Sequence, residues 1–566
     1  MPSHRSCSPL RSRRVRVGNC SGGSPSCSSR SICRGESGSS PEYVKLADPS
    51  SSSISIPVKG PMYRRLATNT VVNIVNLAFN IVINFALAPI FIRALGDEAY
   101  GIWVFVASLS VLRGFLRIFD LGIAASVIKF VAEYDSRRDQ QGVNEVVSAS
   151  LIVYSIVGLV ASGALLLVGL TAVTALFNIP ASQTETVRIL LTWLAFQTIA
   201  DFLGLTASGT LEGLQRYDIT RGSNIVRLLL FAATSIAFLA GGLGVYALAL
   251  STTISELARI AIHVIWIRRL IPGLRLTWRV SGRVLRAIFS LSSKVFIFAL
   301  ANTVYEQMDK LIISVMLTTT LLTDYDISNR LHTLVFALTT MIGPFVVPMA
   351  SSLQATNKSG SLRELYVRAC LYSAVLTVPA TFIMMVIVEP LTVYWLDHSY
   401  AHTANMTRLF VSYILVWYFL RIGQNMLGGV NRLERILPAF IGSIVVNLVV
   451  SVLAAQKLGL IGVVLGTVVG NITAFIPSII VFRREFDLRW KDFSHEIILR
   501  VYPHALTGAF VVYFLIEFRY PASLVEVLVY SIIGGIVFLG LFLLRGIPNT
   551  ERSALYSLGR RLLRLK

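Results

Sequence analysis

Charged residues are scarce in this chain of 566 residues. Asp, Glu, Lys and Arg make up 14% of it, whereas ordinary soluble proteins carry about 25%. Hydrophobic residues make up 54%, and the mean hydropathy is +0.68. A single soluble core stops growing at about 250–300 residues. The composition therefore excludes a soluble globular protein and predicts one that lies in a lipid bilayer.

Cysteine is also scarce, and its spacing fits no known site. Four of the five cysteines precede residue 34, the fifth is Cys370, and no Cys-x-x-Cys pair occurs. We therefore expect no metal site, no cofactor and no disulfide framework.

Motifs of common enzymes are missing as well. The chain has no Gly-x-x-x-x-Gly-Lys-Ser/Thr nucleotide loop, no Gly-x-Ser-x-Gly elbow and no His-Glu-x-x-His zinc motif. Asp324-Tyr325-Asp326 matches the Asp-x-Asp of metal-dependent glycosyltransferases, but this pattern is short and often arises by chance. We expect a protein that is not an enzyme.

Residues 1–61 differ from the rest of the chain. They are rich in Ser, Arg, Gly and Pro and nearly free of aromatic residues. Such a segment cannot bury enough apolar surface to offset its ordering entropy. Three interpretations remain open: a disordered basic tail, a transit peptide suggested by Arg and Ser without an acid before Glu36, or a true start at Met62.

Long hydrophobic runs dominate the remainder. A helix needs about 20 apolar residues to cross a bilayer, and fourteen runs qualify, the seventh being unusually long. They cover residues 68–93, 99–118, 146–170, 186–208, 222–241, 244–267, 286–316, 326–350, 366–393, 405–427, 436–456, 459–482, 499–518 and 523–545. The predicted fold class is an all-α integral membrane protein.

The distribution of basic residues predicts the orientation of these helices. Lys and Arg accumulate in cytoplasmic loops. One alternating set of predicted loops is rich in them, as at Arg137, Arg138 and residues 268–283, and the other set has few. We therefore expect a multi-pass protein of the cell membrane with both termini in the cytoplasm. The same asymmetry explains the net charge of +21 without a nucleic-acid partner.

Two short motifs recur at nearly the same offset. Gly213-Leu214-Gln215-Arg216 returns as Gly429-Val430-Asn431-Arg432 after 216 residues, and Leu243-Gly244-Val245 returns as Ile461-Gly462-Val463 after 218. Parallel repeats of this kind are common in transporters, with the substrate site between the copies. We predict an N-lobe at 62–283, a C-lobe at 284–483, and two additional helices with a basic tail at 484–566.

Three segments resemble one known family. Residues 93–103 carry an R-x-L-G-x-x-x-Y-G-x-W turn, residues 119–134 resemble the family's first large cytoplasmic loop, and residues 211–218 resemble its next one. In these segments the chain is similar to the Wzx-type polysaccharide flippases of the multidrug/oligosaccharidyl-lipid/polysaccharide exporter superfamily. The resemblance covers about residues 62–490.

Membership of that family would imply both a fold and a function. The fold would be two six-helix, MATE-like lobes around a central cavity that opens alternately to either side. The cargo would be a polyprenyl-diphosphate-linked oligosaccharide, moved from the cytoplasmic to the outer leaflet. Glycan polymerases and glycosyltransferases would be its partners.

Two other functions remain open from the sequence. An ion-coupled multidrug or small-molecule antiporter of the same superfamily would have an acidic cavity lined by aromatic residues. A membrane glycan polymerase or ligase would need a large outer loop, and the longest predicted outer loops are residues 171–187 and 390–405.

Asparagines of the first hydrophobic run lie on one helical face. Their steps are four, three, four and four residues. Such a face either hydrogen-bonds to neighbouring helices or forms the polar wall of a cavity for sugar hydroxyls. Asn69, Asn73, Asn76, Asn80 and Asn84 form this face, and Asn73, Asn76 and Asn80 are our candidates for substrate binding.

Basic residues inside the predicted helices are candidates for binding an anionic headgroup. A charge at mid-bilayer costs about 2.5–3.5 kcal/mol on insertion scales, so it needs a partner or a function. Arginine donates two parallel hydrogen bonds to phosphate oxygens. The candidates are Arg259, Lys310, Arg330 and Arg421, and structural salt bridges are the alternative interpretation.

Acidic residues inside the predicted helices are candidates for a coupling-ion site. They are Glu256, Glu306 and Asp309. The spacing allows local pairs between Glu256 and Arg259 and between Glu306 and Lys310. Asp309 is then left without a local partner, which predicts an ion site or a bridge to an arginine on another helix, Arg330 or Arg421.

Overall fold

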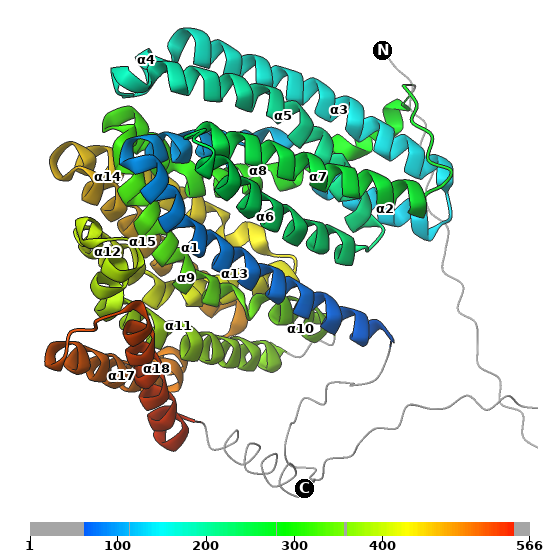
Figure 1. Cartoon of the computed structure of the whole chain (residues 1–566). Helices are drawn as coiled ribbons and strands as arrows, with labels where there is room; N and C mark the ends of the chain where they lie inside the picture. The colour runs from blue at the N-terminus through cyan, green and yellow to red at the C-terminus, as the bar shows by residue number, and fades with distance from the viewer. Residues whose placement is uncertain (1–60, 112–113, 279, 356–358, 548–566) are drawn as a thin grey trace, which may run out of the picture. The chain divides into compact units, whose positions relative to one another are not determined.

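All regular structure in the described residues is helical. The computed structural model describes residues 61–111, 114–278, 280–355 and 359–547, and within these ranges it does not describe the side chains of residues 61–74, 293–295, 298 and 359–360. The predicted all-α fold class is confirmed (Figure 1).

The main helices follow one another without large insertions. In chain order they are α1 (Pro61–Leu109), α2 (Ile123–Ser136), α3 (Gln140–Leu167), α4 (Val173–Leu176), α5 (Thr184–Gly213), α6 (Tyr217–Ala240), α7 (Tyr246–Leu270), α8 (Gly282–Met316), α9 (Leu322–Thr340), α10 (Gly343–Ala355), α11 (Ser359–Trp395), α12 (Thr403–Ser412), α13 (Ile414–Gly429), α14 (Leu437–Leu458), α15 (Leu460–Phe486), α16 (Trp490–Phe493), α17 (Leu499–Phe518) and α18 (Leu524–Leu541).

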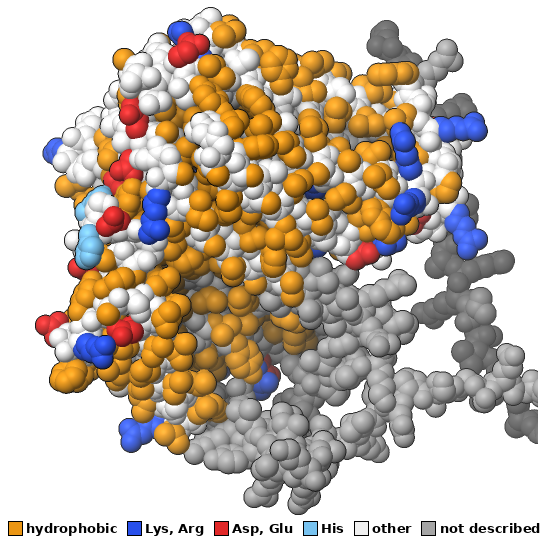
Figure 2. All heavy atoms as spheres, in the orientation of Figure 1, with side chains coloured by type: hydrophobic (Ala, Val, Ile, Leu, Met, Phe, Trp, Pro, Cys, Tyr) orange, Lys and Arg blue, Asp and Glu red, His pale blue; other side chains and the backbone are white. Residues whose placement is uncertain are grey.

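Twelve helical stretches of the described residues are long and apolar enough to cross a membrane, where the sequence predicts fourteen. The first two predicted spans form one of these stretches, Val75–Leu109, because α1 continues past a bend at Gly96 (φ +73°). The seventh predicted span is α8, which is not among the twelve and whose residues 293–295 and 298 have no described side chains. Figure 2 shows a broad hydrophobic face, with charged side chains mainly near two opposite edges.

Helix α2 corrects one expectation. Residues 119–134 were expected to form a cytoplasmic loop, but most of them lie in α2, which packs against α3, α5 and α8. Ile123, Val127 and Val131 recur every four residues and are fully buried, whereas Lys129 is exposed. With 14 residues, α2 is too short to form one of the long apolar runs from which the helices were predicted.

The two copies of the Gly-apolar-amide-Arg motif form the same turn. Gln215 and Asn431 both adopt left-handed backbone conformations, with φ of 58° and 54°. In each turn the arginine N–H donates to the carbonyl five residues earlier, at 2.9 and 2.8 Å. A Cβ on Gly213 would lie 2.7 Å from α2, and one on Gly429 would lie 2.6 Å from α10. These matched turns support our proposal that 62–283 and 284–483 are copies of one unit.

A break in the helix precedes both α2 and α10. The chain leaves the α-helix between Leu109 and Ile123, with a short 3-10 segment at Phe115–Asp120, and again between α9 and α10. Each break is in the second crossing of its proposed copy. Discontinuous helices of this kind often border substrate sites in transporters. Helices α17 and α18 lie against α11, away from α3 and α5 (Figure 1).

Two adjacent glycines at the end of α13 allow a matched test of this packing. Replacing Gly429 with Ala places a Cβ against the Val347 carbonyl oxygen of α10, whereas a Cβ on Gly428 meets nothing within 4 Å. We expect Gly429→Ala to destabilise the protein by about 1–3 kcal/mol and Gly428→Ala to be neutral or slightly stabilising. Thermal unfolding in detergent measures the difference, and equal midpoints would contradict the close approach.

Candidate functional site

A cavity of about 180 Å³ lies where the two proposed copies meet. Helices α1, α5, α6 and α7 line it from the first copy, and α8 and α9 line it from the second. Its charged lining residues are Asp201, Arg227, Lys310, Asp326 and Arg330, which makes three bases against two acids. The cavity therefore favours an anionic occupant.

Arg330 has a full set of partners in this cavity. Its Nε donates to Asp326 Oδ2 at 2.6 Å, and its two terminal nitrogens donate to the Asn84 carbonyl at 2.6 Å and the Tyr100 hydroxyl at 2.8 Å. The Tyr100 hydroxyl in turn donates to Asp326 at 2.6 Å. The cluster neutralises Arg330 and joins α1 of the first copy to α9 of the second. A bridge from Asp309 to Arg330 was one of the alternatives that the sequence left open, and Arg330 instead pairs with Asp326, four residues earlier on the same helix.

Asp309 lies instead in a ring of neutral oxygen-bearing groups. It is 3% exposed and accepts hydrogen bonds from Thr467 at 2.6 Å and from Tyr325 at 3.0 Å. Asn447 donates to the same threonine, and Ser451 joins Asn447 to the Val463 carbonyl, at 2.8 and 3.1 Å. Side chains from α8, α9, α14 and α15 thus converge on one carboxylate. Carboxylate, hydroxyl and carbonyl oxygens are the ligands that hard cations prefer.

The remaining charged candidates are more dispersed. Lys310 lines the cavity, and its Nζ donates to Gln307 at 3.4 Å. Arg421 on α13 has a buried Nε without a hydrogen-bond partner, and Glu306 of α8 exerts an attractive electrostatic effect on it. Glu306 itself is exposed.

The asparagine face of α1 is partly described. The side chains of Asn69 and Asn73 lie outside the described residues. Asn80 and Asn84 donate to backbone carbonyls one turn earlier, each at 2.7 Å, and Asn76 Oδ1 accepts from Asn224 of α6 at 2.9 Å. Of these asparagines, Asn84 lines the cavity. The face therefore also serves as a polar contact between α1 and α6.

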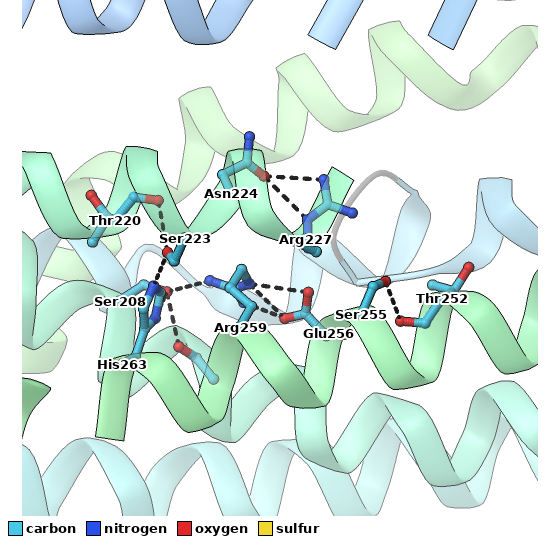
Figure 3. A network of polar contacts seen from close by, with 11 residues as sticks. Ser208, Thr220, Ser223, Asn224, Arg227, Thr252, Ser255, Glu256, Arg259 and His263 are labelled. Atoms are coloured by element: carbon cyan, nitrogen blue, oxygen red, sulfur yellow. Dashed lines mark hydrogen bonds and ion pairs between the residues drawn. The ribbon is translucent and has the colours of Figure 1, made fainter. Parts of the chain in front are cut away.

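A second polar network joins α5, α6 and α7 (Figure 3). Glu256 and Arg259 form the local pair that their spacing predicts, with Arg259 Nε 2.9 Å from one carboxylate oxygen. Arg259 also donates to Ser208 of α5 at 2.8 Å. One turn further along α7, His263 lies 2.7 Å from the Ser223 hydroxyl of α6. Arg259 and Glu256 thus form a salt bridge with each other, and neither residue lines the cavity between the two proposed copies.

Sequence reasoning overlooked two charged residues of the cavity, Asp201 and Arg227. Asp201 is fully buried, and neither carboxylate oxygen has a hydrogen-bond partner. Arg227 donates twice to Asn224 Oδ1, both at 3.1 Å. Both are charged residues inside predicted apolar runs of the sequence. That position could have identified them as candidates.

A larger groove of about 790 Å³ adjoins the cavity. It lies along α5 and α7, and Trp193, Gln197 and Asp201 line both spaces. Its charged residues are Glu185, Arg188, Asp201 and Glu256, so acids outnumber bases here. Within the described residues, no group of three or more His, Cys, Asp or Glu side chains is arranged to hold a metal ion.

A family model decides which proteins this chain is related to. The model for "polysaccharide biosynthesis protein" matches residues 90–405. The chain belongs to this family. That match spans both breaks in the helices and every residue that lines the cavity except Asn84 and Leu87. No curated protein matches the chain by sequence.

Solved structures of transporters share the fold of this polysaccharide biosynthesis protein. The lipid II flippase MurJ in an inward closed conformation has a TM-score of 0.69 at 13% identity, covering 84% of this chain and 98% of that one. An inward-facing multidrug resistance MATE transporter of the MOP superfamily has a TM-score of 0.56 at 15% identity, covering 73% and 94%. MATE in complex with MaD5 gives 0.53 at 16%, covering 76% and 97%. The multi-pass, MATE-like fold is therefore confirmed.

The cluster around Arg330 makes a prediction about stability. Arg330→Met leaves the Asp326 carboxylate buried without its cation, a change that typically costs about 3–5 kcal/mol. The double variant Arg330→Met/Asp326→Leu removes both charges, so we expect it to recover most of that loss. Thermal unfolding of both variants in detergent checks this. A double variant less stable than the single one would show that the ion pair itself stabilises the fold.

Proposed function

We propose that this protein flips a polyprenyl-diphosphate-linked oligosaccharide from the cytoplasmic to the outer leaflet. The observation that carries the proposal is the cationic cavity between the two copies. Arg227, Lys310 and Arg330 line this cavity with the acids Asp201 and Asp326, so bases outnumber acids where a diphosphate would bind. Membership of a polysaccharide biosynthesis family and the fold shared with a lipid flippase support the same cargo class.

The contacts between the copies suggest how the cavity is closed on one side. At the end predicted to face outwards, Arg93 donates to the Leu396 carbonyl and Thr323 donates to the Asp97 carbonyl, both at 2.7 Å. Trp395 stacks on Phe85 with ring centroids 4.1 Å apart. A neutral hydrogen bond such as that of Thr323 contributes about 0.5–1.5 kcal/mol, and one from a charged group such as Arg93 contributes about 1.5–3 kcal/mol. These contacts are weak enough to break when the cavity opens outwards by alternating access.

Asp309 is the best placed of the three candidate coupling-ion residues. Glu256 is committed to Arg259, and Glu306 is exposed. Asp309 is buried among hydroxyl and amide groups from four helices, where a proton or a sodium ion would neutralise it. Because α8 and α9 also line the cavity, an ion at Asp309 would act on helices that contact the cargo.

One observation favours a second candidate function, the ion-coupled antiporter of small molecules. The groove along α5 and α7 contains Glu185, Asp201 and Glu256 with Trp193 and Phe196. An acidic, aromatic-lined groove suits a lipophilic cation. The central cavity, where bases outnumber acids, favours the flippase.

The cellular setting follows from this proposal. The protein would be a multi-pass component of the cell membrane with both termini in the cytoplasm. Its partners would be the lipid-linked glycan, the bilayer, and the polymerases and glycosyltransferases that act before and after translocation. The protein itself would catalyse no covalent step.

Deletion of the gene tests the proposal in cells. In a strain without a redundant flippase, we expect lipid-linked glycan to accumulate on the cytoplasmic leaflet and surface polysaccharide to be lost. Complementation with Lys310→Glu should restore less than a tenth of the surface glycan, because the introduced acid repels the diphosphate in the cavity. Complementation with Lys457→Glu, which changes an exposed lysine, should restore it fully.

Two outcomes would contradict the proposal. One is a deletion strain with normal surface polysaccharide. The other is full restoration by Lys310→Glu at wild-type protein levels, which would separate the cavity's charge from cargo movement.

A further inference from the structure

Among the side chains that the structure describes, Asp201 has two buried oxygen atoms without a hydrogen-bond partner. It lies on α5 and is fully buried. Gln197, one turn earlier, is the polar side chain beside it, and the Oε1 of Gln197 accepts a hydrogen bond from Thr253 at 2.7 Å. An ionised carboxylate without hydrogen bonds costs several kcal/mol or more to bury. Burial of Asp201 therefore costs less with a proton on its carboxyl group than without one.

The charged neighbours of Asp201 are engaged elsewhere. They are Arg227 on α6 and Glu256 and Arg259 on α7. Arg259 hydrogen-bonds Glu256 and Ser208, and Arg227 hydrogen-bonds Asn224. Neither arginine hydrogen-bonds the Asp201 carboxyl in this conformation.

Helices α2 and α3 also pack against α5, and the side chains named below, through which they contact it, are uncharged. Helix α2 meets α5 with Val127 and Val131. Helix α3 contacts α5 through Tyr154. The Tyr154 ring stacks on Phe202, and its hydroxyl donates a hydrogen bond to Asp120. Burial is therefore the largest influence on the charge of Asp201, and its charged neighbours are Arg227, Glu256 and Arg259. Lys310, Asp326 and Arg330 line the same cavity.

Asp201 is reached from two sides. It lines the cavity that contains Arg227 and Lys310, and it lines the groove along α5 and α7. The groove is bordered by Phe196, which is 65% exposed, and Leu257, which is 50% exposed. A proton on Asp201 can therefore exchange with the cavity or with the groove.

The ligand of Asp201 is a proton rather than a metal cation. Hard cations need several oxygen ligands, and Asp309 has such a set in Thr467, Tyr325 and the groups behind them. Asp201 has Gln197 beside it and arginines nearby, which oppose a metal cation. The two buried acids are therefore chemically different sites.

We propose that protonation of Asp201 switches the cavity between high and low affinity for an anionic diphosphate headgroup. This inference rests on the proposed function. With Asp201 protonated, the cavity has three bases against one acid, Asp326; with Asp201 ionised, it has three against two. Protonation therefore strengthens anion binding, and by reciprocity a bound anion strengthens protonation. A rise in pH that ionises Asp201 weakens binding.

Binding of farnesyl diphosphate to the purified full chain in nanodiscs tests the switch. For the wild type we expect the affinity to fall at least about fivefold between mildly acidic and mildly alkaline pH, the lower end of the usual range for coupled sites. Asp201→Asn, which mimics the protonated acid, should keep the high affinity with no more pH dependence than the ligand's own ionisation causes. Lys457→Glu, which changes an exposed lysine that does not line the cavity, should retain the wild-type pH profile, and Asp201→Glu should retain a pH-dependent fall.

The outcomes separate this inference from the proposed function. An Asp201→Asn variant with the same fall in affinity as the wild type overturns the switch but leaves the flippase standing. Absence of binding by the folded wild type at every pH overturns both. Because Asn replaces an unpartnered acid of the same shape, the variant should fold, and thermal unfolding of the variant verifies this.

Discussion

Charge buried in an apolar solvent is the constraint on which the rest of this structure depends. Arg330 is tolerated because Asp326, the Asn84 carbonyl and the Tyr100 hydroxyl all bond to it. Asn84 and Tyr100 lie on α1, whereas Asp326 and Arg330 lie on α9. The hydrogen bonds that satisfy the Arg330 guanidinium therefore also join the two proposed copies. The same cluster forms part of the cavity wall. Fold and site are therefore built from the same contacts.

The ionisable groups of the interior divide into those that are matched and those that are not. Arg330 and Asp326 neutralise each other, as do Arg259 and Glu256. Asp309 has neutral donors in place of a cation, and Asp201 has no hydrogen-bond partner. Groups with matched partners maintain the structure, whereas an unmatched acid has to bind a proton or a cation. Asp201 on α5 and Asp309 on α8 both lie on helices that line the cavity.

Local patterns in the sequence were sufficient for much of the fold. Apolar runs predicted the helices, and the Gly-apolar-amide-Arg motif predicted turns that share a left-handed residue, Gln215 and Asn431. Helix α2 was missed because its 14 residues are too few to form a long apolar run. The Asp326–Arg330 salt bridge could have been predicted from the sequence, because the two residues lie four positions apart on one helix.

The rest of the site depends on contacts distant in sequence. Thr467 lies 158 residues from Asp309 and Tyr100 lies 226 from Asp326, and no periodicity in one sequence brings such residues together. Asp201 was visible as a lone acid in an apolar run, but that it has no hydrogen-bond partner could only be learned from its surroundings. The cavity itself is a product of six helices from both proposed copies.

Translocation in proteoliposomes tests the central claim most directly. The purified protein would be reconstituted with a fluorescent polyprenyl-diphosphate oligosaccharide, and an impermeant reagent would report the glycan exposed on the outer leaflet. A flippase predicts protein-dependent movement of this lipid between leaflets and no comparable uptake of a lipophilic cation such as ethidium. Movement of the cation without movement of the glycan lipid would contradict the account and establish the antiporter instead.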